Sequence, residues 1–174
     1  TILQLCPRLH TGGIDRGTVD AAIAIQEAGF RCVVISGGGD LVTLLEAAGV
    51  THLPLPLYLK SPWEIYRNAK ALASIIDREK PALIHARSRA PICAAHYALK
   101  KFNIPFVTSC HSPHSLGPLD IKKTYNRAII LGDRVIAISQ FIADYLTKNY
   151  PISPDKIDII YRGMDLKHFN PNRI

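Results

Sequence analysis

Two adjacent glycines, Gly12 and Gly13, stand directly before a segment with helical periodicity. At such a position the absent side chains would let a diphosphate approach backbone N–H groups and the positive end of the helix dipole. The pair could equally form an ordinary turn that needs positive φ, and it fits neither the GxxxxGKS/T nor the GxGxxG pattern. The sequence leaves both explanations open.

Arginines are a second source of anion-binding chemistry. In HARSRAP, Arg87 and Arg89 flank Ser88, and a guanidinium at that place could hold a phosphate or an acidic acceptor through two hydrogen bonds. Ser88 is a further candidate for contact with the acceptor or the phosphate. Arg162, in RGMD, could reach the same ligand. The alternatives are solvated loop cations for the first pair and an interdomain turn for Arg162.

A histidine pair follows in TSCHSPHS, where His111 and His114 are three residues apart. No acidic or cysteine ligand lies nearby in sequence, so we expect no metal site. His111 could instead form a hydrogen bond with a sugar hydroxyl or polarise a carbonyl. Because nothing nearby supplies the acid of a Ser-His-Asp triad, hydrolysis is unsupported.

The elements that must position these residues alternate regularly along the chain. Short apolar runs predict strands near 2–6, 32–36, 52–55, 82–86, 105–110, 134–138 and 156–161. Amphipathic segments between them predict helices near 14–28, 40–48, 62–79, 91–102, 120–131 and 139–149. We therefore expect an α/β fold with a doubly wound, mainly parallel Rossmann-like sheet and helices on both faces.

This fold would bring the candidate residues together. Ligands of open parallel sheets bind beyond the carboxyl ends of the strands, and each candidate segment follows an expected strand. A further cluster, Gly37-Gly38-Gly39, also follows a strand, and we interpret it as a flexible turn in preference to a site of ligand approach.

The composition of the chain limits the kinds of partner that it could bind. The formal net charge of +7 and the isoelectric point of about 9.4 favour an anionic partner, but the basic residues are scattered and do not indicate nucleic-acid binding. The four cysteines are far apart, which favours reduced thiols. Since no apolar window approaches the length of a membrane span, we expect a cytoplasmic protein, attached at most to a membrane surface.

Three stretches taken together resemble the N-terminal half of a retaining GT-B glycosyltransferase of the large family four. They are TGGIDRGTVDAAIAIQEAGFRCVVISGGG, ALIHARSRAPICAAHYALKKFNIPFVTSCHS and DRVIAISQFIADYLTKNYPISPDKIDIIYRGMDLKHFNP. The most specific part is GMDLKHFNP, residues 163–171, which in this family leads into a second domain. The combination of RG, RSRAP and RGMD is similar to members that build bacterial envelope polysaccharide and lipopolysaccharide.

The resemblance implies a domain organisation. Residues 1–162 would be the acceptor-side Rossmann-like domain and residues 163–174 the start of an interdomain linker. A C-terminal domain outside this chain would hold most of the nucleotide-sugar donor and would be a partner of this one. Transfer would retain the anomeric configuration and need no metal or cofactor, and the domain alone would be inactive.

The resemblance also implies residue roles. Gly12 and Gly13 would lie near the donor diphosphate, His111 would contact the transferred sugar, and Arg16 would contact acceptor or phosphate. The acceptor would be a cell-envelope glycan or a lipid-linked molecule, met at an anionic membrane surface that suits the basic charge.

Two alternatives from other classes remain. One is a free-standing, non-catalytic module that binds a nucleotide or a sugar phosphate through the same loops. The other is a nicotinamide-dependent oxidoreductase, which the missing GxGxxG and the missing acidic ribose partner disfavour.

Overall fold

The fold is a single sheet of seven parallel strands in the order β3-β2-β1-β4-β5-β6-β7. A computed structural model describes residues 1–114 and 124–163. The strands are β1 (Ile2–Leu5), β2 (Cys32–Ser36), β3 (Thr51–Pro54), β4 (Leu83–Arg87), β5 (Phe106–Cys110), β6 (Arg134–Ala137) and β7 (Ile157–Ile159). This is the doubly wound order, so the predicted fold class is confirmed.

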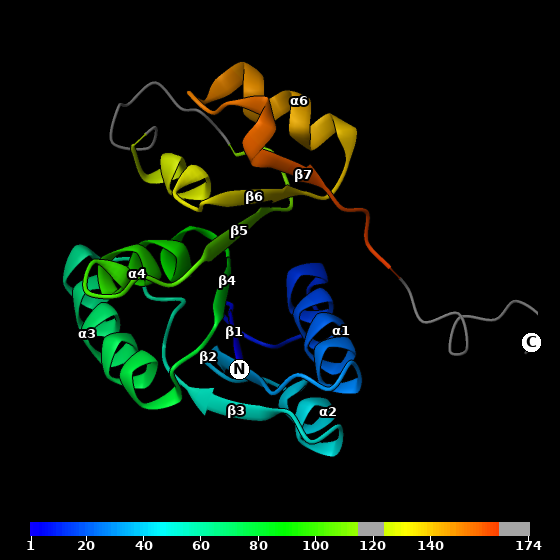
Figure 1. Cartoon of the computed structure of the whole chain (residues 1–174), viewed down its shortest axis with the longest axis vertical. Helices are drawn as coiled ribbons and strands as arrows, with labels where there is room; N and C mark the ends of the chain where they lie inside the picture. The colour runs from blue at the N-terminus through cyan, green and yellow to red at the C-terminus, as the bar shows by residue number, and fades with distance from the viewer. Residues whose placement is uncertain (115–123, 164–174) are drawn as a thin grey trace, which may run out of the picture.

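Helices cover both faces of the sheet, with α1 and α2 on one side and α3 and α4 on the other (Figure 1). Their bounds are α1 (Gly13–Glu27), α2 (Val42–Ala47), α3 (Pro62–Glu79), α4 (Arg89–Leu99) and α6 (Gln140–Asn149), with 3-10 helices η1 (Arg127–Ile130) and η2 (Pro154–Lys156). The helix expected over 120–131 lies partly outside the described residues, and its described part is one helical turn followed by η1. No helix in the described ranges is long and apolar enough to span a membrane.

Two apolar clusters hold these layers together. The larger one joins side chains of the central strands, such as Leu5 and Ile84, to α3, α4 and α6. The smaller one lies under α1 and α2 and contains Val19, Val34 and Leu45. All four cysteines are free thiols, as their spacing predicts.

The central strands are less uniformly apolar than the sequence pattern suggests. Along β4, Ile84 and Ala86 join the larger core, whereas His85 and Arg87 alternate with them and so lie on the other face of the sheet. His85 Nε2 forms a hydrogen bond with Ser109 Oγ on β5. A buried polar seam therefore runs toward the carboxyl edge, beneath α1.

The chain order reverses at β1 and β4, because β2 and β3 extend from one side of β1 and the later strands extend from the other. At such a switch point the loops diverge and leave a crevice beyond the strand ends. The loops after β1, β4 and β5 meet there, and they carry most of the candidate residues.

The glycines after β2 serve loop packing. Gly39 has a φ of +143°, and a Cβ at this position would lie 2.2 Å from the Leu9 carbonyl oxygen in the loop after β1. A Cβ on Gly37 would lie 2.5 Å from the Tyr58 ring. The absent side chains thus let three loops approach one another behind the crevice.

We predict that Gly39→Ala lowers the free energy of unfolding by about 2–4 kcal/mol, because it combines a strained backbone with an overlap against backbone atoms. Gly38→Ala is the matched control. Gly38 also has positive φ, +78°, but open space around it, so its replacement should cost about 1–2 kcal/mol. Urea unfolding measures both values, and equal losses would contradict the proposed loop packing.

Candidate functional site

The N-terminus of α1 provides backbone donors at the crevice. Gly12 is the N-cap residue, with φ −69° and ψ 153°, and it contributes no side-chain cap. The N–H groups of Gly13 and Ile14 meet no acceptor among the described residues. Unsatisfied donors and the helix dipole make this end attractive to an anion.

Crowding, and not backbone conformation, is what the structure shows at Gly13. Neither Gly12 nor Gly13 has positive φ, so the alternative of a turn that needs positive φ is wrong. A Cβ on Gly13 would lie 2.7 Å from Arg162 Nη1. The absence of a side chain lets the Arg162 guanidinium lie against the first turn of α1.

Arg162 also fixes the tautomer of His111. Its Nη2 donates to His111 Nδ1 at 3.0 Å. Since a guanidinium can only donate, Nδ1 accepts, and the ring proton sits on Nε2. That Nε2 is buried and has no hydrogen-bond partner within the described residues. His111 therefore presents an unused N–H donor.

The imidazole stays neutral. Burial, reinforced by the nearby Arg87 and Arg162, lowers the pKa of His111 to about 3. A group with so low a pKa is a weak proton acceptor at neutral pH, which favours hydrogen-bond donation over general-base work. No three metal-binding side chains come together in the described part of the chain, so His111 and His114 have no third ligand there.

Arg87 supplies a buried positive charge. It is only 5% exposed and donates to Gln4 Oε1, a neutral acceptor. None of the ion pairs among the described residues includes it. Burial lowers the pKa of Arg87 to about 10, which still leaves the guanidinium charged at neutral pH.

Ser88 stands between two hollows. It has φ +69° and ψ 152°, a region that almost only glycine adopts and that costs about 1–3 kcal/mol. On one side is a small recess, which we call the α1 recess, lined by Ile14, Ser88, Ser109, His111, Ser112, His114 and Ile129. On the other is a cavity of about 390 Å³. The strained residue therefore forms the boundary that the two hollows share.

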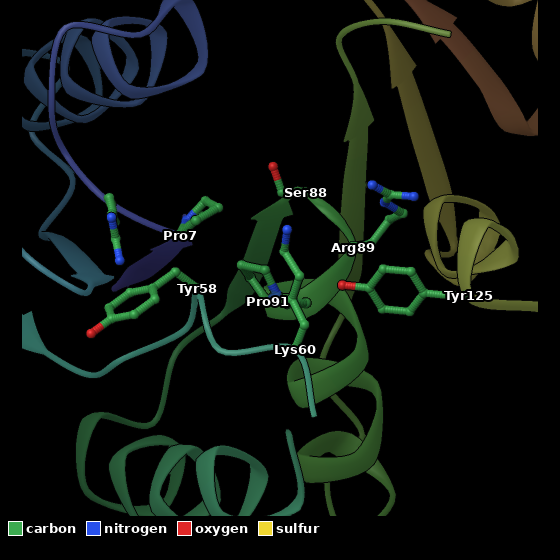
Figure 2. Close-up of a pocket in the computed structure, with 9 residues that line it drawn as sticks. Pro7, Tyr58, Lys60, Ser88, Arg89, Pro91 and Tyr125 are labelled. Carbon is green, nitrogen blue, oxygen red and sulfur yellow. The ribbon is translucent and has the colours of Figure 1, made fainter. Parts of the chain in front are cut away.

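This larger space, which we call the basic cavity, is drawn in Figure 2. It is lined by Pro7, Arg8, Tyr58, Lys60, Ser88, Arg89, Ala90, Pro91 and Tyr125. Sequence reasoning considered Arg89 but missed Arg8 and Lys60. The available signal was their place: each follows an expected strand, at the edge where ligands bind.

The structure brings together most, but not all, of the candidate residues. His111 and Ser88 line the α1 recess. Arg162 lies beside it, hydrogen-bonded to His111 and close to Gly13, and Arg87 is the residue before Ser88, at the end of β4. Arg16 instead pairs with Asp20 at 2.8 Å on the exposed surface of α1. Contact of Arg16 with acceptor or phosphate stays a prediction.

The doubly wound parallel sheet and its similarity to a solved glycosyltransferase define the class of protein as a Rossmann-like half of a GT-B fold. The sequence matches the model of Glycosyltransferase Family 4 over residues 11–168, so the chain belongs to that family. Both the fold and the family predictions are confirmed. Retention of configuration stays a prediction.

Solved structures support this assignment. A glycosyltransferase from Rickettsia africae ESF-5 is 36% identical, with a TM-score of 0.84, and the match covers 99% of this chain and 45% of that one. HepE from Anabaena, solved with UDP and glucose, is 22% identical, with a TM-score of 0.75 and coverages of 98% and 47%. The lipopolysaccharide outer core galactosyltransferase WaaB is 17% identical, with a TM-score of 0.71 and coverages of 95% and 46%.

The last two similarities show the fold alone. This chain spans less than half the length of each of the three proteins. No curated protein sequence matches it significantly. The predicted linker, residues 163–174, lies outside the described residues except for Gly163.

The buried histidines make stability depend on pH. Burial and the neighbouring Arg87 and His111 hold the pKa of His85 well below its usual range. The unfolded chain then binds a proton below about pH 6.5 that the folded chain does not, so stability falls as pH falls. Between pH 7.5 and 5.5, His85 should contribute a loss of about 1.4 kcal/mol.

We predict that His85→Gln reduces, by this amount, the stability that the protein loses between pH 7.5 and 5.5. This prediction holds whether or not the substitution changes the stability at pH 7.5. Urea unfolding at the two pH values measures the difference. An unchanged pH dependence in the variant would show that His85 is not the buried neutral group described above.

Proposed function

We propose that this chain is the acceptor-side half of an enzyme that transfers a sugar, with retention of configuration, from a nucleotide-sugar donor to a cell-envelope glycan or a lipid-linked acceptor. The observation that carries the proposal is the α1 recess. The unused donor of His111 lines this recess, Arg162 and the unpaired N–H groups of α1 lie beside it, and the buried Arg87 is close enough to lower the pKa of His111. No described carboxylate forms an ion pair with either arginine.

The recess suits the charge that develops during transfer. When the bond between sugar and diphosphate breaks, negative charge grows on the leaving diphosphate, and preorganised positive groups stabilise it. Arg87, Arg162 and the N-terminus of α1 would supply that stabilisation without a metal ion. The Nε2–H of His111 would donate to a hydroxyl of the transferred sugar.

The position of Ser88 suggests how the two substrates meet. A sugar held at His111 would lie on one side of Ser88, and an acceptor in the basic cavity would lie on the other. The acceptor hydroxyl would attack the sugar carbon at this boundary as the bond to the diphosphate breaks, and its proton would pass to the leaving diphosphate. Ser88 would then contact the acceptor close to the reacting atoms.

The remaining half of the donor site would belong to a C-terminal domain reached through the linker at residues 163–174. Closure of two domains excludes water from such a cleft and favours transfer over hydrolysis. We therefore propose that the 174 residues alone transfer no sugar. The related structures, more than twice as long as this chain, are consistent with that division.

We also propose that the protein meets its acceptor at an anionic membrane surface through the start of α3. Trp63 is 67% exposed and Tyr66 48% exposed, with ring centroids 6.1 Å apart. Lys70 Nζ lies 4.7 Å from the centre of the Tyr66 ring, and Lys60 is exposed just before the helix. Aromatic and basic side chains together favour the interface of an anionic bilayer.

The catalytic proposal is tested in the full-length protein with Gly13→Ala. The added methyl group should displace the Arg162 guanidinium and lower kcat/KM for the nucleotide-sugar donor about tenfold, the effect of one lost charge-assisted hydrogen bond. Stability should not fall, because alanine favours a helix over glycine. Steady-state kinetics and urea unfolding measure the two effects.

Gly17→Ala is the matched control, one turn further along α1. Its Cβ would lie 4.0 Å from Arg162 Cζ, which is an ordinary contact, so kcat/KM should be unchanged. An unchanged value in Gly13→Ala as well would contradict the diphosphate assignment. NMR of the product anomer tests retention, and donor binding without transfer would favour the non-catalytic binding module.

The membrane proposal predicts that this chain sediments with anionic vesicles and that Trp63→Ala weakens binding about threefold or more, because a buried interfacial indole is lost. Phe141→Ala is the matched control, since Phe141 on α6 is also 67% exposed. Equal effects of the two substitutions would contradict a membrane-facing role for α3.

A further inference from the structure

The basic cavity carries more positive charge than recognition of a neutral sugar requires. Arg8 and Lys60 reach it from two separate loops and Arg89 from the first turn of α4, and no acidic side chain of the described residues lines it. Within the described residues, none of the three forms an ion pair. In Figure 2 the Lys60 side chain rises into the space that the other lining residues surround.

The two arginines are held by neutral groups. Arg8 Cζ lies 3.8 Å from the centre of the Tyr58 ring, and Arg89 Cζ lies 4.9 Å from that of Tyr125. Arg89 also donates to Asn126 Oδ1. Stacking on an aromatic face orients a guanidinium and leaves its positive charge without an anionic partner.

The N-terminus of α4 adds to the positive electrostatic potential of the basic cavity. Ser88 gives no side-chain cap, no acidic residue occupies the first turn, and Ala90 and Pro91 line the cavity. The positive end of an 11-residue helix therefore faces the same space as the three cations.

We propose that the basic cavity binds a phosphate or diphosphate group carried by the acceptor. This inference rests on the proposed function, under which the chain binds an acceptor. It adds the chemical class of that acceptor, which is a phosphorylated molecule. A phosphate carries a charge near −2 at neutral pH and offers acceptors to guanidinium and ammonium groups together. A volume of about 390 Å³ also leaves room for the adjoining sugar unit or chain.

The position of Ser88 determines where the acceptor phosphate would lie relative to the donor. Because it lines both hollows, the phosphate would sit near the acceptor hydroxyl that attacks the donor sugar. The cations of the basic cavity would keep the acceptor phosphate from repelling the donor diphosphate beside the α1 recess.

The test is a titration of this chain with inorganic pyrophosphate, followed by amide NMR so that each site is observed separately. The signals of Lys60, Ser88 and Ala90 should shift on binding. Lys60→Gln and Arg89→Gln should each weaken the affinity measured from these signals about five- to tenfold. Lys100→Gln is the matched control, because Lys100 also lies over a tyrosine, Tyr97, at the far end of α4, and it should change nothing.

Two further ligands distinguish between the two kinds of acceptor that could carry the phosphate. Glucose 1-phosphate represents a soluble phosphorylated glycan, and dihexanoyl phosphatidic acid represents a lipid phosphate. The ligand that shifts these signals at the lower concentration identifies the source. If neither shifts them, or if Lys60→Gln and Arg89→Gln bind pyrophosphate as the wild type does, the inference is overturned.

The readout needs no sugar transfer, so the two proposals fail separately. A full-length protein without transferase activity would overturn the proposed function and leave the phosphate site standing. An active transferase whose chain shows no pyrophosphate shifts at Ser88 and Ala90 would overturn the phosphate site alone.

Discussion

The crevice depends on one electrostatic constraint, the burial of Arg87 without a described counterion. Its hydrogen-bond partner, Gln4, is neutral, so the positive charge is not cancelled inside the protein. A buried charge acts through a medium of low dielectric, and its potential therefore reaches the adjacent recess with little screening. Together with burial, which is the larger cause, that potential lowers the pKa of His111 and so keeps the imidazole a neutral hydrogen-bond donor. An anion bound there would supply the missing countercharge.

Cations on both sides of Ser88 would let the two proposed anionic groups meet at one sheet edge. Arg87 and Arg162 stand on the side of the α1 recess, and Arg89 and Lys60 stand on the side of the basic cavity, with Ser88 between them. The strained backbone of Ser88 lets this single residue connect β4 to α4 and face both hollows. Strain of this kind persists only where the surrounding structure enforces it, and it clusters at functional sites.

Much of the fold could be predicted from the sequence because buried parallel strands and amphipathic helices have distinct periodicities. The positions of Gly13 and His111 at the crevice follow from the rule that ligands bind beyond strand ends. The pairing of Arg162 with His111 could not be predicted, since the two are 51 residues apart and only the sheet order brings them together. Lys60 was missed although it follows an expected strand, because the irregular connection after that strand has no periodicity to indicate which of its residues reach the crevice. The burial of Arg87 was missed because an arginine beside a loop is usually solvated.

The central claim is that the diphosphate of the donor binds at the N-terminus of α1, beside the α1 recess. It is tested most directly by a crystal structure of the full-length protein with its preferred nucleoside diphosphate sugar, or with an unreactive analogue. We predict diphosphate oxygens within hydrogen-bond distance of the Gly13 or Ile14 N–H and of the Arg162 guanidinium, with His111 Nε2 donating to the sugar. A diphosphate bound away from α1, with Arg162 and His111 still paired only with each other, would contradict the account.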